Sequence, residues 1–106
     1  MATSMTRSTS VTGPTPWMLI NLNAFRGGVG LLANLSGGAA TFNIEVTGQD
    51  PKLPGFGTIY NIMDGMGGLS ASANNSLAYP CTAIRINVLS ITAPAVVSLS
   101  VVQAVD

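Results

Sequence analysis

Hydrophobic residues recur at every second position along three segments of this 106-residue chain. In residues 40–47 the positions between them are Thr, Asn, Glu and Thr. The same two-residue period is present in residues 83–88 and 97–102. Successive side chains of a β-strand point to opposite faces of a sheet, so this spacing is typical of a strand with one buried face. The pattern predicts three strands between residues 40 and 102.

Three further segments, residues 17–22, 29–35 and 58–63, are apolar enough to be buried. Periodicity alone does not separate such short runs from helices. Neighbouring glycines disfavour helix by about 1 kcal/mol each relative to alanine, so strands are expected here too. The whole series predicts an all-β fold, a small antiparallel β-sandwich or jelly roll, with an incomplete barrel as the alternative.

Residues 1–16 are crowded with Ser and Thr and end in Gly13, Pro14 and Pro16. Such a segment has too little apolar surface to offset the entropy of ordering it. We therefore expect an extended N-terminal arm over residues 1–16 and a single β-sandwich domain over residues 17–106. The arm either orders against a partner or remains disordered.

Two connections, residues 48–57 and 64–76, are rich in Gly, Pro, Ser and Asn. Loops of ten or more residues are uncommon in a small domain and are usually functional or ordered by a partner. We expect one of them to contact another molecule.

Only eight residues are charged, four of each sign, and the chain has no histidine. An ordinary domain devotes roughly a quarter of its residues to charged side chains. A surface with so few charges is weakly protected against self-association, which favours a chain held in an assembly.

The missing histidine leaves Ser, Thr and Cys without their usual catalytic base. A glycosidase-like carboxyl pair drawn from Glu45, Asp50 and Asp64 is the remaining catalytic alternative. Solvated surface is the stronger interpretation, because Glu45 falls on the polar face of its strand and the other two fall in loops. We expect no catalytic residues, no metal and no cofactor.

The basic residues Arg7, Arg26, Lys52 and Arg85 are scattered, which argues against direct binding of nucleic acid. No apolar run approaches the eighteen or so residues needed to span a membrane, and none is expected to insert.

Cys81 is the sole cysteine, so no disulfide forms within the chain. It is expected to be a small buried hydrophobic residue in a chain that folds in a reducing compartment. Gly27, Gly28 and Gly30 resemble a phosphate-binding loop only faintly, and a turn or close backbone approach is the better interpretation.

Arg85 lies in the middle of a predicted strand, between Ile84 and Ile86. Glu45 is the carboxylate that another predicted strand carries. We expect Arg85 and Glu45 to form a structural pair across neighbouring strands, with ligand binding by Arg85 as the alternative.

The C-terminal quarter of the chain carries a family resemblance. Residues 77–88 read LAYPCTAIRINV, and residues 97–103 read VSLSVVQ. This sequence resembles the closing strand pair of small capsid decoration, or cement, proteins in the virions of tailed bacteriophages. Cys81 stands where a small aliphatic residue is expected, and Pro94 lies in a turn that is usually richer in Ser and Gly.

The resemblance implies a non-enzymatic structural protein that binds the outside of an assembled shell and stabilises it. Its partner would be the major capsid protein, and it would itself be a homo-oligomer, with a trimer favoured at local three-fold positions. It would reside on the capsid surface of the virion after assembly in the bacterial cytoplasm.

Several residues are candidates for contact with that partner: Thr3, Arg7 and Val11 in the arm, and Phe56, Met63 and Met66 in or beside the long connections. Core packing is the alternative for the last three. A tail or baseplate subunit is a second candidate function. A receptor- or glycan-binding module is a third, in which Trp17, Tyr60 and Tyr79 would offer stacking faces.

Overall fold

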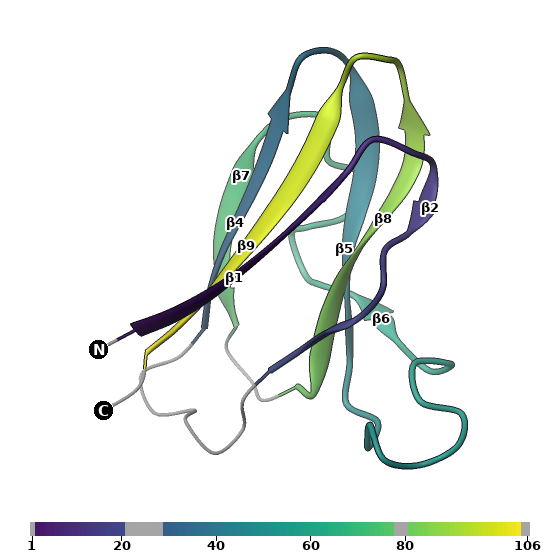
Figure 1. The fold of residues 1–106 in the computed structure, drawn as a ribbon, viewed down its shortest axis with the longest axis vertical. Helices are drawn as coiled ribbons and strands as arrows, with labels where there is room; N and C mark the ends of the chain where they lie inside the picture. Colours follow the sequence, from purple (N-terminus) through teal and green to yellow (C-terminus); the bar gives the residue numbers. More distant parts are fainter. Residues whose placement is uncertain (1, 21–28, 78–80, 105–106) are drawn as a thin grey trace.

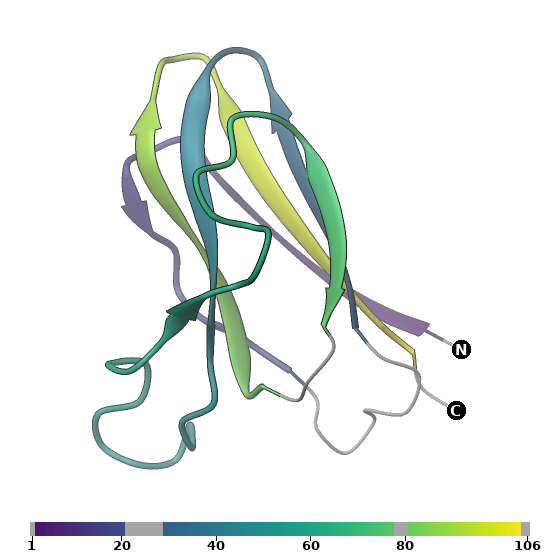
Figure 2. The same ribbon diagram turned by 180° about the vertical axis from the view of Figure 1, so that it is seen from behind.

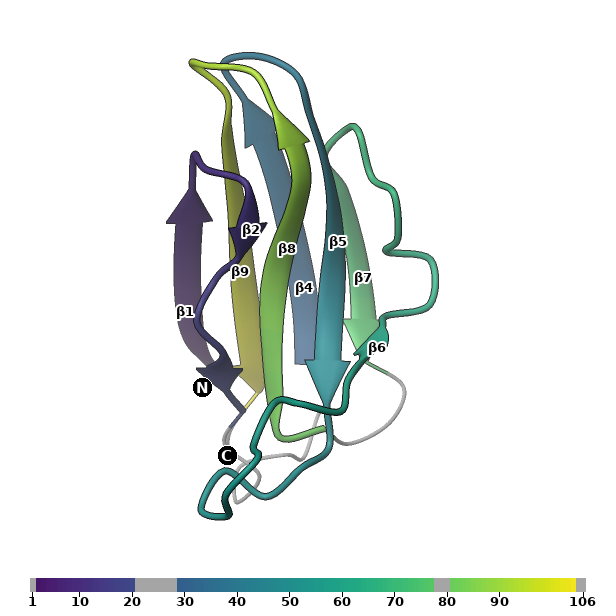
Figure 3. The same cartoon turned by 90° about the vertical axis from the view of Figure 1, so that its right-hand side faces the viewer.

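The computed structural model describes residues 2–20, 29–77 and 81–104, which form two packed antiparallel sheets (Figure 1). The first sheet contains, in spatial order, β1 (Ala2–Thr9), β9 (Val96–Ala104), β4 (Val29–Ser36) and β7 (Ala73–Leu77). The second contains β2 (Gly13–Pro14), β8 (Ala83–Ile91), β5 (Ala40–Thr47) and β6 (Asn61–Ile62), with β3 (Met18–Leu19) also paired to β8. Figure 3 looks onto the second sheet, with the first sheet behind it. The predicted all-β sandwich is confirmed.

The core lies between the two sheets and is made by the apolar positions of the alternating segments. At these positions each side chain is at most 4% exposed: Leu31, Phe42, Ile44, Val46, Ile84, Ile86, Val88, Val97, Leu99 and Val101. Burying one such side chain stabilises a fold by roughly 1.5–3 kcal/mol. The two-residue period therefore correctly predicts which face of β5, β8 and β9 points to the core.

The weaker apolar segments form strands of unequal length. Residues 29–35 fall within β4. Of the predicted strand at residues 17–22, β3 covers two residues, and the N–H of Ile20 donates to the carbonyl of Thr82 at 2.8 Å. Residues 21 and 22 lie outside the described residues. The strand predicted at residues 58–63 is reduced to β6, because the chain before it leaves the sheet.

The expectation of an N-terminal arm over residues 1–16 is wrong, because this segment contributes β1 to the first sheet and β2 to the second. β1 pairs with β9 along its whole length, from Ala2 opposite Ala104 to Thr9 opposite Val97. β2 pairs with β8, and the N–H of the buried Thr15 donates to the carbonyl of Ile86 at 2.8 Å. The domain boundary expected at residue 16 is therefore wrong.

Polar groups order this N-terminal segment. The antiparallel ladder with β9 satisfies one side of the β1 backbone, and Met5 is the apolar side chain of β1 that packs against the core. Hydroxyl pairs between the strands add to it, with Thr6 and Ser100 at 3.0 Å and Ser8 and Ser98 at 2.9 Å. Low apolar content predicts an unpaired arm, because it carries no signal for order that comes from backbone and hydroxyl bonds.

The connection expected over residues 64–76 is also partly strand, since β7 begins at Ala73. The preceding stretch runs beside β5 on its way from β6 to β7 (Figure 2). The N–H groups of Ile44 and Phe42 donate to the carbonyls of Met66 and Leu69, both at 2.9 Å.

Among the described residues, no helix is long and apolar enough to cross a membrane.

Candidate functional site

A buried ion pair lies on the outer face of the second sheet. Glu45 on β5 and Arg85 on β8 are directly opposite each other in the strand register. The Nε of Arg85 donates to Oε1 of Glu45 at 2.7 Å, and the amide of Asn87 donates to Oε2 at 3.0 Å. Both carboxylate oxygens are thus hydrogen-bonded, as a buried charge requires. The predicted pairing of Arg85 with Glu45 is confirmed.

The position of Glu45 differs from expectation in one respect. The strand pattern predicts a solvated face for its side chain, yet Glu45 is only 2% exposed. Glu45 is flanked in the strand register by Arg85 of β8 and Ile62 of β6, and two aromatic rings lie over Arg85, so the polar side of β5 is covered as well as its apolar side. Asp50 and Asp64 are exposed, and the described residues hold no group of three side chains able to bind a metal ion.

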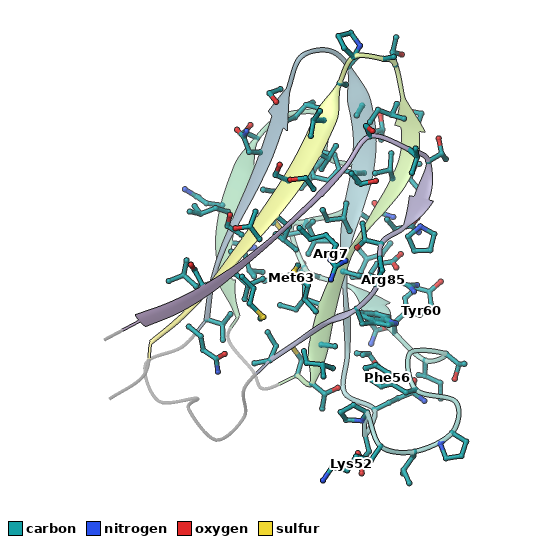
Figure 4. The ribbon with its side chains drawn as sticks, in the orientation of Figure 1. Arg7, Lys52, Phe56, Tyr60, Met63 and Arg85 are labelled. Carbon is teal, nitrogen blue, oxygen red and sulfur yellow. The ribbon has the colours of Figure 1, made fainter. Side chains whose placement is uncertain are left out.

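Two aromatic rings cover the guanidinium of Arg85. Its Cζ lies 4.3 Å from the ring centroid of Trp17 and 4.5 Å from that of Tyr60. The ring of Trp17 also packs against Tyr60 and Phe56, each with centroids 6.2 Å apart. Figure 4 shows Arg85, Tyr60 and Phe56 following one another from the sheet toward the loop. A cation held against aromatic faces contributes roughly 0.5–2 kcal/mol, and more as water is excluded.

Hydrogen bonds fix the loop of residues 48–60 to the strands beneath it. The hydroxyl of Thr47 donates to the carbonyl of Ile59 at 2.7 Å, and the N–H of Ile59 donates to the side-chain oxygen of Gln49 at 2.9 Å. The hydroxyl of Thr82 on the β8 side donates to the carbonyl of Gln49 at 2.6 Å. The loop is therefore anchored near both of its ends.

Gly57 is required by the contact between this loop and Trp17. Its φ of +85° lies in the left-handed region, and a Cβ built there would collide with the indole nitrogen of Trp17. Only glycine meets both conditions without strain. Gly57 thus allows the loop backbone to lie directly on the indole ring.

The anchored loop and β6 expose four large hydrophobic side chains, which we call the docking patch. They are Leu53 (60% exposed), Ile59 (71%), Tyr60 (42%) and Ile62 (51%). Single exposed hydrophobic residues are ordinary, whereas several on one short, hydrogen-bonded segment make it a candidate interaction surface. No sequence signal marked this patch beyond the expectation that one long connection contacts a partner.

The structure separates the residues that were expected to contact a partner. Met63 and Met66 are 3% and 1% exposed and belong to the core, so the alternative of core packing holds for them. Their backbones bond to β5, which turns the side chains inward. Phe56 is half-buried against Trp17. Val11 is 66% exposed in the turn between β1 and β2.

On β1, Thr3 pairs through its backbone with Gln103, and Arg7 lies opposite Leu99, half-buried at the edge of the first sheet. These positions place both residues far along the sequence from the docking patch and on the other sheet.

The remaining candidates are placed as follows. Cys81 is 4% exposed. Burial raises the pKa of its thiol and a hydrogen bond with the backbone of Ala83 lowers it, and the net result is a pKa of about 11. It packs in the core as predicted. Gly30 lies inside β4 and not in a phosphate-binding turn. Arg26, Gly27, Gly28 and Tyr79 lie outside the described residues.

Comparison with models of known protein families, with curated proteins and with solved structures finds no match.

Proposed function

We propose that this protein is a non-enzymatic structural subunit of a tailed-bacteriophage virion, which binds the outside of the assembled shell as a decoration protein. The docking patch would contact the major capsid protein. The observation that carries the proposal is the exposure of four large hydrophobic side chains on a loop held in place by the Arg85 stack.

The rigidity of the loop favours tight binding. Ordering a flexible loop on association opposes binding, whereas a loop already fixed by Thr47, Gln49 and Thr82 loses little freedom. Removing apolar surface from water contributes about 25 cal/mol per Å². A partner with a complementary apolar hollow would gain this contribution without first organising the loop.

The charges near the docking patch are few and mixed in sign. Asp50 and Lys52 are the charged residues within residues 48–60, and the carboxylate of Asp50 accepts a hydrogen bond from the N–H of Lys52 at 2.9 Å. Lys52 lies at the outer end of the loop in Figure 4. A surface without a dominant charge fits a protein partner better than nucleic acid, which requires a basic surface.

Binding only to the assembled shell would stabilise that shell by mass action. If the subunit is a trimer, three weak docking patches act together, and their combined affinity exceeds that of one patch by orders of magnitude. This arrangement suits a protein that must stay on a particle after release from the cell.

The glycan-binding alternative has less support. A sugar would stack on an open aromatic face. Trp17 is half-buried, and its ring is occupied by Arg85, Tyr60 and Phe56. These contacts favour a packing role for Trp17.

Co-sedimentation tests the proposal. The purified chain is mixed separately with empty shells and with isolated tails of the phage that encodes it, and bound protein is measured in the pellet. Saturable binding to shells is expected. Binding to tails alone would replace the proposal by a tail subunit, and binding to neither particle would overturn it.

A further inference from the structure

The first sheet ends in two strands, β1 and β7, whose outer sides meet no other strand of the described residues. An unpaired edge presents free N–H and C=O groups and is a ready template for another strand. Proteins usually protect such edges with lysine or proline. Neither β1 nor β7 contains a lysine or a proline, and β7, with the sequence ANNSL, has no charged residue.

One charged residue lies on the β1 edge and one lies beside the β7 edge, and the two have opposite signs. Arg7 is the charged residue of β1, and it has no hydrogen bond or ion pair with any part of the chain that the structure describes. It lies on the inner side of its strand, in the row of Leu99 and Ala33. An inward charge on an edge strand opposes pairing with an uncharged strand. A strand that brings a carboxylate would remove this obstacle.

Asp64 supplies such a carboxylate at the other edge. The side-chain amide of Asn75 on β7 donates to the backbone carbonyl of Asp64 at 3.1 Å, so Asp64 lies beside β7. Asp64 is exposed to solvent. Asn75 stands opposite Leu31, which faces the core, so Asp64 adjoins the inner side of β7, the same side on which Arg7 lies on β1.

The strand directions also match. β1 is antiparallel to β9, β9 to β4, and β4 to β7. β1 and β7 of one copy therefore run in opposite directions. If β7 of a second copy lies beside β1, the alternation of strand directions continues without interruption, and the inner faces of the two sheets stay on the same side. Antiparallel pairing of this kind needs no change in either edge.

We infer that this chain associates with further copies of itself head to tail, with β1 of one copy paired to β7 of the next and Arg7 facing Asp64 of that next copy. Symmetric pairings are disfavoured, because β1 with β1 brings two Arg7 side chains to one interface and β7 with β7 brings two Asp64 side chains. Repeated head-to-tail contacts close into a ring or extend into a filament. The inference is independent of the docking patch, which lies on the second sheet and its loop.

A charge exchange tests the contact. Sedimentation velocity over a concentration series is measured at low salt, where screening is weak, for wild type, Arg7→Glu, Asp64→Arg and the double variant. Each single change places like charges at the interface and is expected to weaken association roughly tenfold or more. The double variant restores opposite charges and is expected to recover most of the association. Lys52→Glu, which changes an exposed charge on the loop, is the matched control and should associate as wild type.

Two results would overturn the inference: a wild-type chain that stays monomeric at every concentration, or a double variant as weak as the single variants while melting curves show all of them folded.

Cross-linking distinguishes the head-to-tail arrangement from the symmetric ones. Ser4 on β1 and Ser76 on β7 are exposed serines at the two edges. The variants Ser4→Cys and Ser76→Cys are treated with a short bismaleimide, separately and mixed. A covalent dimer is expected only in the mixture. Dimers of Ser4→Cys alone or of Ser76→Cys alone would show a symmetric contact and refute the inference. Wild type is the control, since its Cys81 is buried.

Discussion

The guanidinium carbon of Arg85 lies 4.3 Å from the ring centre of Trp17, so the cation that neutralises Glu45 also supports the aromatic cover of the second sheet. One side chain thereby joins the buried ion pair to the loop that bears the docking patch. Loss of Arg85 should affect both the stability of the sheet and the position of the loop.

Arg85→Ala is expected to destabilise the fold by about 3 kcal/mol, because removing one partner leaves the other as an uncompensated buried charge. For a domain of this size the melting temperature should fall by roughly 10 °C or more. Thermal unfolding followed by circular dichroism measures it. The double variant Arg85→Met with Glu45→Leu should recover much of the loss. An unchanged melting curve for Arg85→Ala would show that the pair has no structural role.

Gly57→Ala is expected to destabilise the protein by about 1–3 kcal/mol, because it adds a Cβ at a positive φ and against the indole of Trp17. The emission of Trp17, the sole tryptophan, should shift in the same variant. Gly48→Ala is the matched control, since a Cβ there meets no atom within 4 Å. Equal effects at the two glycines would contradict the close contact.

Ile59→Ser and Leu53→Ser are expected to leave stability within about 0.5 kcal/mol of wild type, because both side chains are largely exposed. The same changes should weaken co-sedimentation with shells at least several-fold. Val11→Ser alters an equally exposed side chain outside the docking patch and should bind normally. Normal shell binding by both loop variants would exclude the docking patch as the contact.

The stability contributed by the neutral Cys81 thiol should decline in alkaline solution. Burial raises its pKa from 9.0 to about 11, so the folded state retains its proton after the unfolded chain has lost it. This contribution is complete below pH 9.0 and disappears as the pH rises through about 11, a difference of roughly 2–3 kcal/mol. Urea unfolding of wild type and Cys81→Ala between pH 8 and 11 isolates it. Parallel pH profiles for the two proteins would contradict the raised pKa.

The strands with a regular apolar period could be predicted from sequence, because the period directly reports which face is buried. β5 and β8 carry this signal clearly, and the register that places Glu45 opposite Arg85 follows from their pairing. The ion pair could also be predicted from sequence, because few charged residues lie on the predicted strands and Arg85 therefore had few possible carboxylate partners.

The remaining features depend on contacts that a linear pattern does not encode. β1 is ordered by β9 through backbone and hydroxyl bonds, which its Ser- and Thr-rich sequence shares with disordered segments. The burial of Glu45 depends on its neighbours in the register, Arg85 and Ile62, and on the aromatic rings that lie over Arg85. Met63 and Met66 lie in a Gly-rich stretch, and only its hydrogen bonds to β5 turn them into the core.

The pairing of Ala2 with Ala104 brings the two ends of the described fold to the same corner of the sandwich (Figure 1). A passenger domain fused at either end would therefore project from one place. A short Gly-Ser linker across this corner would give a circularly permuted chain, with new ends opened in the exposed turn around Pro94, that keeps every strand neighbour intact.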